Sequence, residues 1–171
     1  MNLIVCVHAH WGIGNKGELL VSIPGDKRMF KENTTGKVVL GGRKTMEGLP
    51  GGTTLKGRTN IVLTHQKDYT FGDAIIVHSK EEALERLKEY NDEDIFIIGG
   101  EKVYRDFLPY CKKAYVTKVD YRYEADVFFP NLDEDSDWVM THDSDEQTYY
   151  DLEYYFTIYQ RKDSLPNHSL Q

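Results

Sequence analysis

Apolar runs alternate with helix-like segments through the first 110 residues, and strand-like runs dominate the remainder. The run Ile95–Ile98 is apolar at every position, which is typical of a strand buried on both faces. Further strands are predicted at 2–7, 37–40, 60–64, 74–77 and 114–119, with a C-terminal β-hairpin within 149–160. Strands that alternate with helices form parallel sheets, so this order predicts a single α/β domain. We expect a mostly parallel central β-sheet of about eight strands, about four flanking helices and antiparallel C-terminal strands.

Four segments have the spacing or the end signals of helices, namely 24–35, 43–49, 79–90 and 101–108. In the first, Pro24 suits the opening turn, and Asp26 falls where the helix dipole favours an acid. The third opens with Ser79 and Glu82, which together predict a capping box.

Two predicted strands run into paired glycines and then into the start of a helix. One is Gly41–Thr45, which adds two cations and a threonine hydroxyl, and the other is Gly99-Gly100. Glycine lets backbone approach a ligand closely, and a helix N-terminus offers free N–H groups to a phosphate. One interpretation of these turns is a phosphate site. The alternatives are a tight turn with nothing bound and, for Arg43 and Lys44, solvated surface charge.

The segment Gly12–Gly17 matches the G-x-G-x-x-G dinucleotide fingerprint in its letters. That fingerprint needs a helix that opens at the glycines, whereas 18–23 is a short, mostly apolar run closed by Pro24. We therefore expect a glycine-hinged loop that covers a site.

Asp26 is the acid whose setting is most suggestive of chemistry. A charge in the first turn is the commonest use of such an aspartate. Phe30 follows four residues later and so shares its helical face. This spacing indicates an acid held beside an apolar pocket.

Cys6, His8 and His10 alternate, so in a continuing strand they would share one face and resemble a metal site. We expect the strand to end near His8, and no fourth ligand lies nearby in the sequence. No metal is therefore expected.

Composition narrows the possible partners. The chain has 171 residues, a mass of 19.8 kDa, a net charge of −7 and a pI near 5.4, which argues against a generic nucleic-acid or acidic-membrane surface. No run approaches the roughly 18 apolar residues of a membrane span, and no signal peptide is expected. Two cysteines make no disulfide framework and suit a reducing cytoplasm. We expect a cytoplasmic monomer.

Taken in order, several segments resemble the dihydrofolate reductase family over about residues 2 to 161. The matching segments are Gly12–Gly14, Pro24–Lys31, Gly42–Thr45, Leu55–Asn60, Ile97–Gly100 with Val103 and Tyr104, Thr117, Glu124–Asp126 and Phe129–Pro130. The resemblance implies one domain over 1–161, and we expect a disordered tail over 162–171.

The resemblance also implies a set of substrate-binding residues. Asp26 resembles the family's only ionisable active-site side chain, which binds the pteridine ring. Thr117 resembles the residue that supports this contact through a bound water. Arg58 matches the arginine that grips the glutamate α-carboxylate. The other expected substrate residues are Ile4, Val5, Lys27, Phe30, Lys31, Leu49 and Ile98.

NADPH is the cofactor that the resemblance implies. Arg43, Thr64 and Lys102 fall where the family binds the 2′-phosphate, and Gly99-Gly100 matches a family cis peptide. The other expected cofactor residues are Cys6, Ile13, Gly14, Leu19, Gly42, Lys44, Thr45, Leu63, His65, His78, Ile98, Glu101, Val103 and Tyr104.

The implied reaction is hydride transfer from C4 of NADPH to C6 of 7,8-dihydrofolate, with protonation at N5. In this interpretation Asp26 orients and polarises the pterin, while water, controlled by the loop Gly12–Leu20, delivers the proton. Apolar neighbours should raise the pKa of Asp26.

The chain departs from the family pattern at four places. Leu19-Leu20-Val21 stands where members usually carry Leu/Met-Pro-Trp, and Gly41 replaces the usual methionine. Lys27 adds a cation beside Asp26, and the loop Pro50–Thr54 has no arginine. Because the tryptophan is missing, the sequence does not indicate by which route the proton reaches N5.

Three other classes of protein fit part of the pattern. A sister reductase acting on another pteridine or pyrimidine, as in riboflavin synthesis, would need the cofactor loops but not Asp26, Phe30 and Arg58 together. A non-catalytic module would bind NADPH without oxidising it. A structural protein would explain neither the cations at the glycine turns nor the acid.

Overall fold

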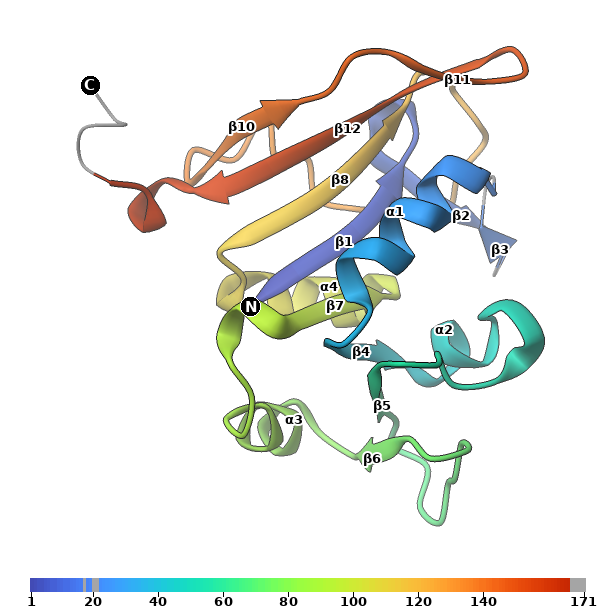
Figure 1. Ribbon diagram of the computed structural model, residues 1–171, viewed down its shortest axis with the longest axis vertical. Coiled ribbons are helices and arrows are strands. Elements are labelled where there is room, and N and C mark those ends of the chain that lie inside the picture. The colour runs from blue at the N-terminus through green and yellow to red at the C-terminus, as the bar shows by residue number, and fades with distance from the viewer. Residues whose placement is uncertain (17, 20–21, 167–171) are drawn as a thin grey trace. The chain divides into compact units, whose positions relative to one another are not determined.

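A computed structural model describes residues 1–16, 18–19 and 22–166 of the chain. Nine strands of the described chain form one sheet, in the order β10-β12-β8-β1-β7-β4-β5-β6 with β11 beside β12 (Figure 1). The predicted fold class, a mixed α/β sheet with antiparallel C-terminal strands, is confirmed. The chain divides into two compact units, residues 1–3 with 29–110 (unit 1) and residues 4–28 with 111–171 (unit 2).

Unit 1 is built on parallel strands. The start of β1 (Asn2–Val7) pairs with β7 (Ile95–Gly99), and β7 pairs in turn with β4 (Val38–Gly42). Further along, β4 pairs with β5 (Thr59–Leu63), which pairs with β6 (Ile75–Val77). The β7 side chains are buried throughout, as the unbroken apolar run predicts.

Helices α2 (Arg43–Glu47), α3 (Lys80–Leu87) and α4 (Glu101–Phe107) also belong to unit 1. The Ser79 hydroxyl accepts the Glu82 N–H at 3.0 Å, as the predicted capping box requires. The Glu82 carboxylate accepts the N–H of His78 rather than that of Ser79, at 2.8 Å. Helix α1 (Pro24–Thr34) begins in unit 2 and ends in unit 1.

Unit 2 is mainly antiparallel. Strand β12 (Leu152–Arg161) lies between β8 (Lys113–Val119) and β10 (Trp138–Asp143), and forms a hairpin with β11 (Gln147–Tyr149) (Figure 1). A hairpin was predicted within 149–160, but its turn lies at the start of that range, so that 152–161 is one strand. Strand β10 was not predicted, because its second half is polar and exposed and so lacks a strand-like apolar pattern.

A small second sheet carries the glycine segment. Here β2 (Gly12–Asn15) pairs with β3 (Glu18–Leu19) and with β9 (Val127–Phe128), both antiparallel. No helix opens at Gly12, so the dinucleotide fingerprint does not have its usual structure here, as we expected. Gly17, Leu20 and Val21 of this segment lie outside the described residues.

The end of the chain differs in part from the expected disordered tail. Lys162–Ser164 forms one 3₁₀ turn, in which the Leu165 N–H donates to the Lys162 carbonyl at 3.2 Å. Residues 167–171 lie outside the described part. The domain boundary at 161 stays a prediction.

Cys6 and Cys111 are both free thiols. Strand β1 ends at Val7, before His8, as predicted. Within the ranges that the structure describes, no group of three or more His, Cys, Asp or Glu could hold a metal ion. No helix there is long and apolar enough to cross a membrane.

Candidate active site

Asp26 lies in the first turn of α1 and is held from β8 of the same unit. The buried Thr117 hydroxyl donates to Asp26 Oδ1 at 2.6 Å, a short charge-assisted hydrogen bond. This contact is direct, whereas the resemblance implied support through a bound water, which stays a prediction. A carboxylate fixed in this way can accept hydrogen bonds from a ligand through its second oxygen.

Asp26 is half-buried, and Ile23, directly before its helix, belongs to an apolar cluster of unit 2. Ile23, Val119 and Tyr154 form a buried cluster, against which Cys6 and Phe156 pack. Burial raises the pKa of Asp26, while hydrogen bonds from Thr117 and Cys6 partly oppose that rise. The predicted direction of the pKa shift is therefore confirmed. Phe30 follows one turn later in the same helix.

Gly25, directly before Asp26, lies against Tyr154. A Cβ atom added at Gly25 would collide with the Tyr154 hydroxyl, while the ring carbon behind it would stay at an ordinary 3.4 Å. Tyr154 is only 5% exposed and has little room to retreat. Glycine at this position therefore lets the start of α1, and with it Asp26, sit close to β12.

We predict that Gly25→Ala lowers the free energy of unfolding by about 1–3 kcal/mol, the usual cost of overpacking. Urea denaturation measures this cost in the wild-type background and again in a Tyr154→Phe background, which removes the colliding hydroxyl. The cost should largely disappear in the second background. An equal cost in both would show that Tyr154 is not the reason for the glycine.

In unit 1 the two glycine turns lie against each other. Gly41 is the partner of Gly99 in the pairing of β4 with β7. A Cβ at Gly41 would lie 3.3 Å from the Gly99 carbonyl, and one at Gly100 would lie 3.2 Å from the Thr45 hydroxyl. The Gly99–Gly100 peptide bond is cis, as the resemblance implied. Side chains at these positions would crowd the facing turn, so glycine lets the two turns pack closely.

Both glycine turns lead into helices that lack a side-chain cap. Gly42 and Gly100 are the N-caps of α2 and α4, and neither provides a side-chain hydrogen bond. The Tyr104 hydroxyl donates to the Ile98 carbonyl at 3.0 Å and so braces the second turn. The first backbone N–H groups of each helix therefore have no hydrogen bond from the side chain of the N-cap residue.

The cations expected at the 2′-phosphate are paired within their own helices. Arg43 Nη1 lies 2.9 Å from Glu47 Oε1, and Lys102 Nζ lies 3.0 Å from Asp106 Oδ2. Ion pairs of this i,i+4 kind near the surface contribute little to stability. Thr64 and His78 meet directly, because the Thr64 carbonyl lies 3.0 Å from His78 Nδ1.

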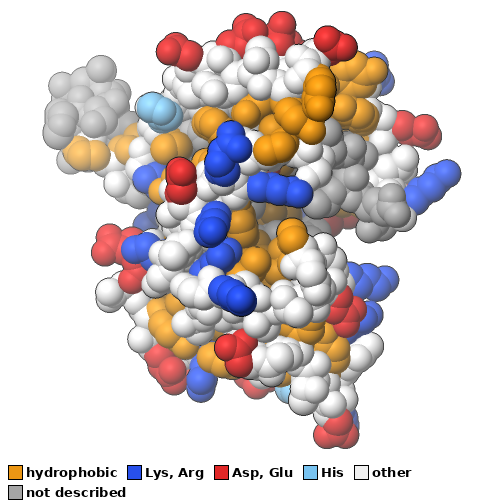
Figure 2. All heavy atoms as spheres, turned by 45° about the vertical axis from the view of Figure 1, so that its right-hand side comes forward, with side chains coloured by type: hydrophobic (Ala, Val, Ile, Leu, Met, Phe, Trp, Pro, Cys, Tyr) orange, Lys and Arg blue, Asp and Glu red, His pale blue; other side chains and the backbone are white. Residues whose placement is uncertain are grey.

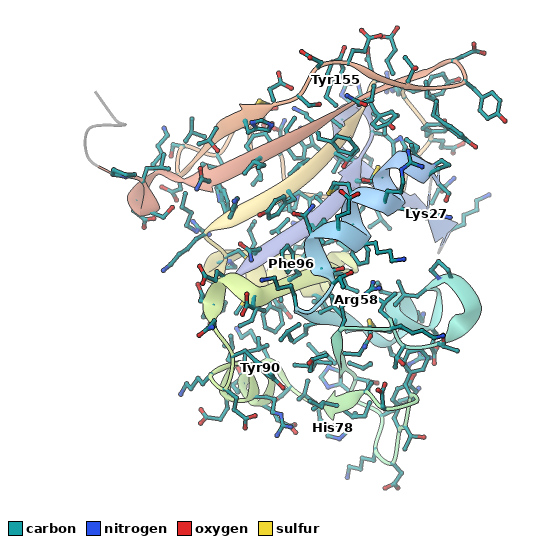
Figure 3. The ribbon with its side chains drawn as sticks, viewed as in Figure 1. Lys27, Arg58, His78, Tyr90, Phe96 and Tyr155 are labelled. Carbon is teal, nitrogen blue, oxygen red and sulfur yellow. The ribbon has the colours of Figure 1, made fainter. Side chains whose placement is uncertain are left out.

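Arg58 stands in the segment that leads into β5 (Figure 3). Its Nε donates to the Lys56 carbonyl at 2.9 Å, which fixes the guanidinium plane. The Asn60 side chain, 4% exposed, donates to the carbonyls of Leu55 and Arg58 and accepts the Leu55 N–H, each at 3.0 Å. Asn60 thus ties together the turn that presents Arg58.

Within the two units the remaining expected residues lie as follows. Lysines and arginines are among the side chains exposed on the face drawn in Figure 2, and Lys27 and Lys31 are exposed residues of α1. Leu49 follows α2 and is half-buried. Unit 1 holds Phe30, Lys31, Gly42, Arg43, Lys44, Thr45, Leu49, Arg58, Leu63, Thr64, His65, His78, Ile98, Gly99, Gly100, Glu101, Lys102, Val103 and Tyr104. Unit 2 holds Ile4, Val5, Cys6, Ile13, Gly14, Leu19, Asp26, Lys27 and Thr117.

Sequence reasoning missed two contributions near the expected site residues: Gly25 beneath Tyr154 and the Asn60 brace on the Arg58 turn. Asn60 did carry a signal, since a polar amide within a buried strand must find partners. Gly25 carried none, because its partner Tyr154 is remote in the sequence.

Comparisons with known proteins agree with this geometry. A family model described as dihydrofolate reductase matches residues 1–161. The dihydrofolate reductase of Staphylococcus haemolyticus is 39% identical over 165 residues, covering 94% of this chain and 95% of that relative. The Bacillus subtilis (strain 168) enzyme is 34% identical over 168 residues, covering 96% of each. A solved structure, described as dihydrofolate reductase from Enterococcus faecalis complexed with NADP(H) and RAB-propyl, is 31% identical with a TM-score of 0.83, covering 95% of this chain and 96% of that one. The chain belongs to the dihydrofolate reductase family.

Proposed function

We propose that the protein reduces 7,8-dihydrofolate to 5,6,7,8-tetrahydrofolate with NADPH as the hydride donor, and so supplies tetrahydrofolate for one-carbon metabolism. Family membership supports the reaction, and the NADP(H) complex of the Enterococcus faecalis relative supports the cofactor. The observation that carries the proposal is Asp26, a half-buried carboxylate beside an apolar cluster, with Thr117 bonded to one oxygen. An acid kept there at a cost in burial is expected to serve a ligand.

Asp26 is proposed to bind the pteridine through ring N3 and the 2-amino group. These groups are hydrogen-bond donors, and a carboxylate is an acceptor that orients both at once. Orientation matters because hydride transfer needs the donor and acceptor carbons at near-contact distance. Val5, Phe30 and Leu49 are proposed to wall the pterin and benzoyl groups, and the carbonyls of Ile4 and Ile98 to accept from the ring.

The residues that would hold NADPH are the two glycine turns and their neighbours. The close backbone packing at Gly41, Gly99 and Gly100 fits a pyrophosphate that lies against main chain. Arg43, Thr64 and Lys102 are proposed to take the 2′-phosphate, which favours NADPH over NADH. When bound, NADPH supplies the hydride.

Protonation at N5 is proposed to use water rather than Asp26 directly. The β2–β3 hairpin, with Gly12 and Gly14 in its first strand, is proposed to admit or exclude that water. The residues that replace the family's usual tryptophan segment, Leu20 and Val21, lie outside the described chain. We also propose that the protein acts as a cytoplasmic monomer without nucleic-acid or membrane partners, which its acidic charge and free thiols support.

The proposal is tested by the loss of NADPH absorbance on adding dihydrofolate, with NADH in a parallel reaction and chromatographic identification of the product. Turnover that prefers NADPH and yields tetrahydrofolate supports it. NADPH oxidation only with another pteridine or a pyrimidine substrate would favour the sister reductase. Cofactor binding without oxidation would favour the binding module.

The Asn60 brace gives a further prediction about Arg58. Asn60→Ala should raise the KM for dihydrofolate about tenfold, because the turn that presents the guanidinium loses its three hydrogen bonds. A dihydropterin without the glutamate tail serves as the control substrate, and its kcat/KM should change little. Equal losses for both substrates would mean that Asn60 does not act through Arg58.

A further inference from the structure

Trp11 stands directly before the β2–β3 hairpin and is held by aromatic and backbone contacts within unit 2. Its buried ring stacks on Phe129 with the ring centroids 6.2 Å apart and meets Tyr159 edge-on at 5.8 Å. Its carbonyl accepts the Phe129 N–H at 2.8 Å, and Gly12, the next residue, pairs with Phe128 of β9. The position of Trp11 therefore sets where β2 begins.

The backbone is strained at this point. His10 and Trp11 both have a φ of 63°, in the left-handed region that residues other than glycine rarely adopt. Such a conformation costs free energy and persists only where the surrounding contacts enforce it. The contacts made by the Trp11 side chain can enforce it here.

A cation on β8 completes the packing around Trp11. The Lys118 ammonium lies 4.9 Å from the centroid of the Trp11 ring and 5.6 Å from that of Tyr159. A cation over an aromatic face is attracted by the electrons of the ring, most strongly over tryptophan. Lys118 Nζ also donates to Asp133 Oδ2 and to the Tyr159 hydroxyl, each at 3.0 Å, and that hydroxyl donates to Asp133 Oδ1 at 2.7 Å. The ammonium is thus fixed over Trp11 by a carboxylate and a buried phenol.

The contacts to Trp11 and to Asp26 come from opposite faces of one strand. Thr117, which donates to Asp26, directly precedes Lys118 on β8, and successive residues of a strand point to opposite faces of the sheet. Thr117 therefore faces the start of α1, whereas Lys118 faces Trp11. A change at Lys118 can reach the hairpin without removing a contact to the acid.

We propose that Trp11 is a positioning residue for the reductase reaction: held by Lys118, it fixes the start of the β2–β3 hairpin in the place from which that hairpin controls water at the reacting pterin. The inference rests on the proposed function and on the proposed role of the hairpin. None of Trp11, Lys118 and Asp133 is among the residues that the family resemblance implied.

Two substitutions at Lys118 separate the cation from the bulk of the side chain. Lys118→Met removes the charge and keeps most of the length, whereas Lys118→Arg keeps a cation over Trp11. In Lys118→Met the single-turnover rate of hydride transfer at saturating substrates should fall about fivefold, a factor within the range of a cation–π contact. The KM for dihydrofolate should stay unchanged, because Asp26 keeps its hydrogen bond from Thr117. Lys118→Arg should restore the rate.

Tryptophan fluorescence reports directly on how Trp11 is held. The chain has two tryptophans, so Trp138→Phe leaves Trp11 as the only indole fluorophore. In that background acrylamide should quench the Trp11 emission more steeply in Lys118→Met, and Lys118→Arg should restore the shallower quenching. An unchanged quenching curve in Lys118→Met would show that Lys118 does not hold Trp11, and it overturns the inference.

Arg161 provides the matched control. Its guanidinium carbon lies 4.6 Å from the centroid of the Trp138 ring, where β10 pairs with β12. Arg161→Met should lower stability in urea denaturation but leave the rate of hydride transfer unchanged. A wild-type rate in Lys118→Met, or an equal loss of rate in Arg161→Met, overturns the inference.

A second variant keeps the inference testable where Lys118→Met fails to fold. Asp133→Asn weakens the hold on the Lys118 ammonium and keeps the shape of the side chain, so a smaller loss of rate in the same direction is expected. A wild-type rate in Asp133→Asn would then overturn the inference. If the wild-type protein oxidises no NADPH with dihydrofolate, the proposed function itself fails, and the inference fails with it.

Discussion

Replacing Asp26 with asparagine is expected to slow hydride transfer to dihydrofolate by about a hundredfold or more. Asparagine has nearly the same shape, and its amide oxygen can still accept the Thr117 hydroxyl hydrogen bond. What it lacks is the second acceptor oxygen and the negative charge that the pterin N–H groups need. Single-turnover loss of NADPH absorbance measures the change.

The same substitution should not destabilise the protein. A carboxyl group whose pKa is raised in the folded state costs stability once pH rises above its unfolded pKa, because folding then opposes ionisation. At neutral pH, asparagine removes this cost, so the free energy of unfolding should stay level or increase. Parallel losses of activity and stability would contradict the assignment and make Asp26 a structural residue.

The second large effect is expected from His8, directly after β1. Its side chain is 5% exposed, its Nδ1 is buried without a hydrogen-bond partner, and its ring meets Tyr123 edge-on at 4.7 Å. Burial lowers the pKa of His8 to about 4 from the ordinary 6.5. A protonated imidazolium there would be desolvated without a partner.

The sign of the resulting pH dependence follows from proton binding. Between pH 6.5 and about 4 the unfolded chain binds a proton at His8 that the folded chain does not, so stability falls as pH falls through this window. We expect this group to lower the free energy of unfolding by about 3 kcal/mol across this window. Urea denaturation at a series of pH values measures the total loss of stability as the pH falls.

A His8→Phe variant isolates the contribution of His8 from that of other titrating groups. Phenylalanine keeps an aromatic ring against Tyr123 but carries no proton, so its stability curve should fall less steeply over the same window. Curves that run parallel from neutral pH to pH 4 would show that His8 does not drive the acid loss.

Periodicity and end signals were enough to predict most of the fold. The apolar run 95–98 became β7, Pro24 opened α1, and Ser79 capped α3. Strands β2, β3, β9 and β10 were missed, because the first three have only two to four residues and the last is half exposed. Such strands are defined by their pairing partners rather than by their own pattern.

The candidate site was predictable only in part. The helical spacing of Asp26 and Phe30 indicated the acid, whereas the role of Arg58 came from the family resemblance. The Asp26–Thr117 contact joins residues 91 positions apart, which no local pattern reveals. The collision that a side chain at Gly25 would make with Tyr154 depends on how α1 packs against strands of unit 2. Side-chain packing of this kind is set by tertiary structure and cannot be predicted from the spacing of residues along the sequence.

The most direct test of the central claim, that Asp26 is the ionisable group on which dihydrofolate reduction depends, is the pH dependence of single-turnover hydride transfer in wild type and Asp26→Asn. Because Asp26 orients and polarises the pterin in this account, the wild-type rate should titrate with pH through the raised pKa of this group. The asparagine variant should be slow and should lack that titration. The same titration in both proteins would contradict the account, because another group would then control the reaction.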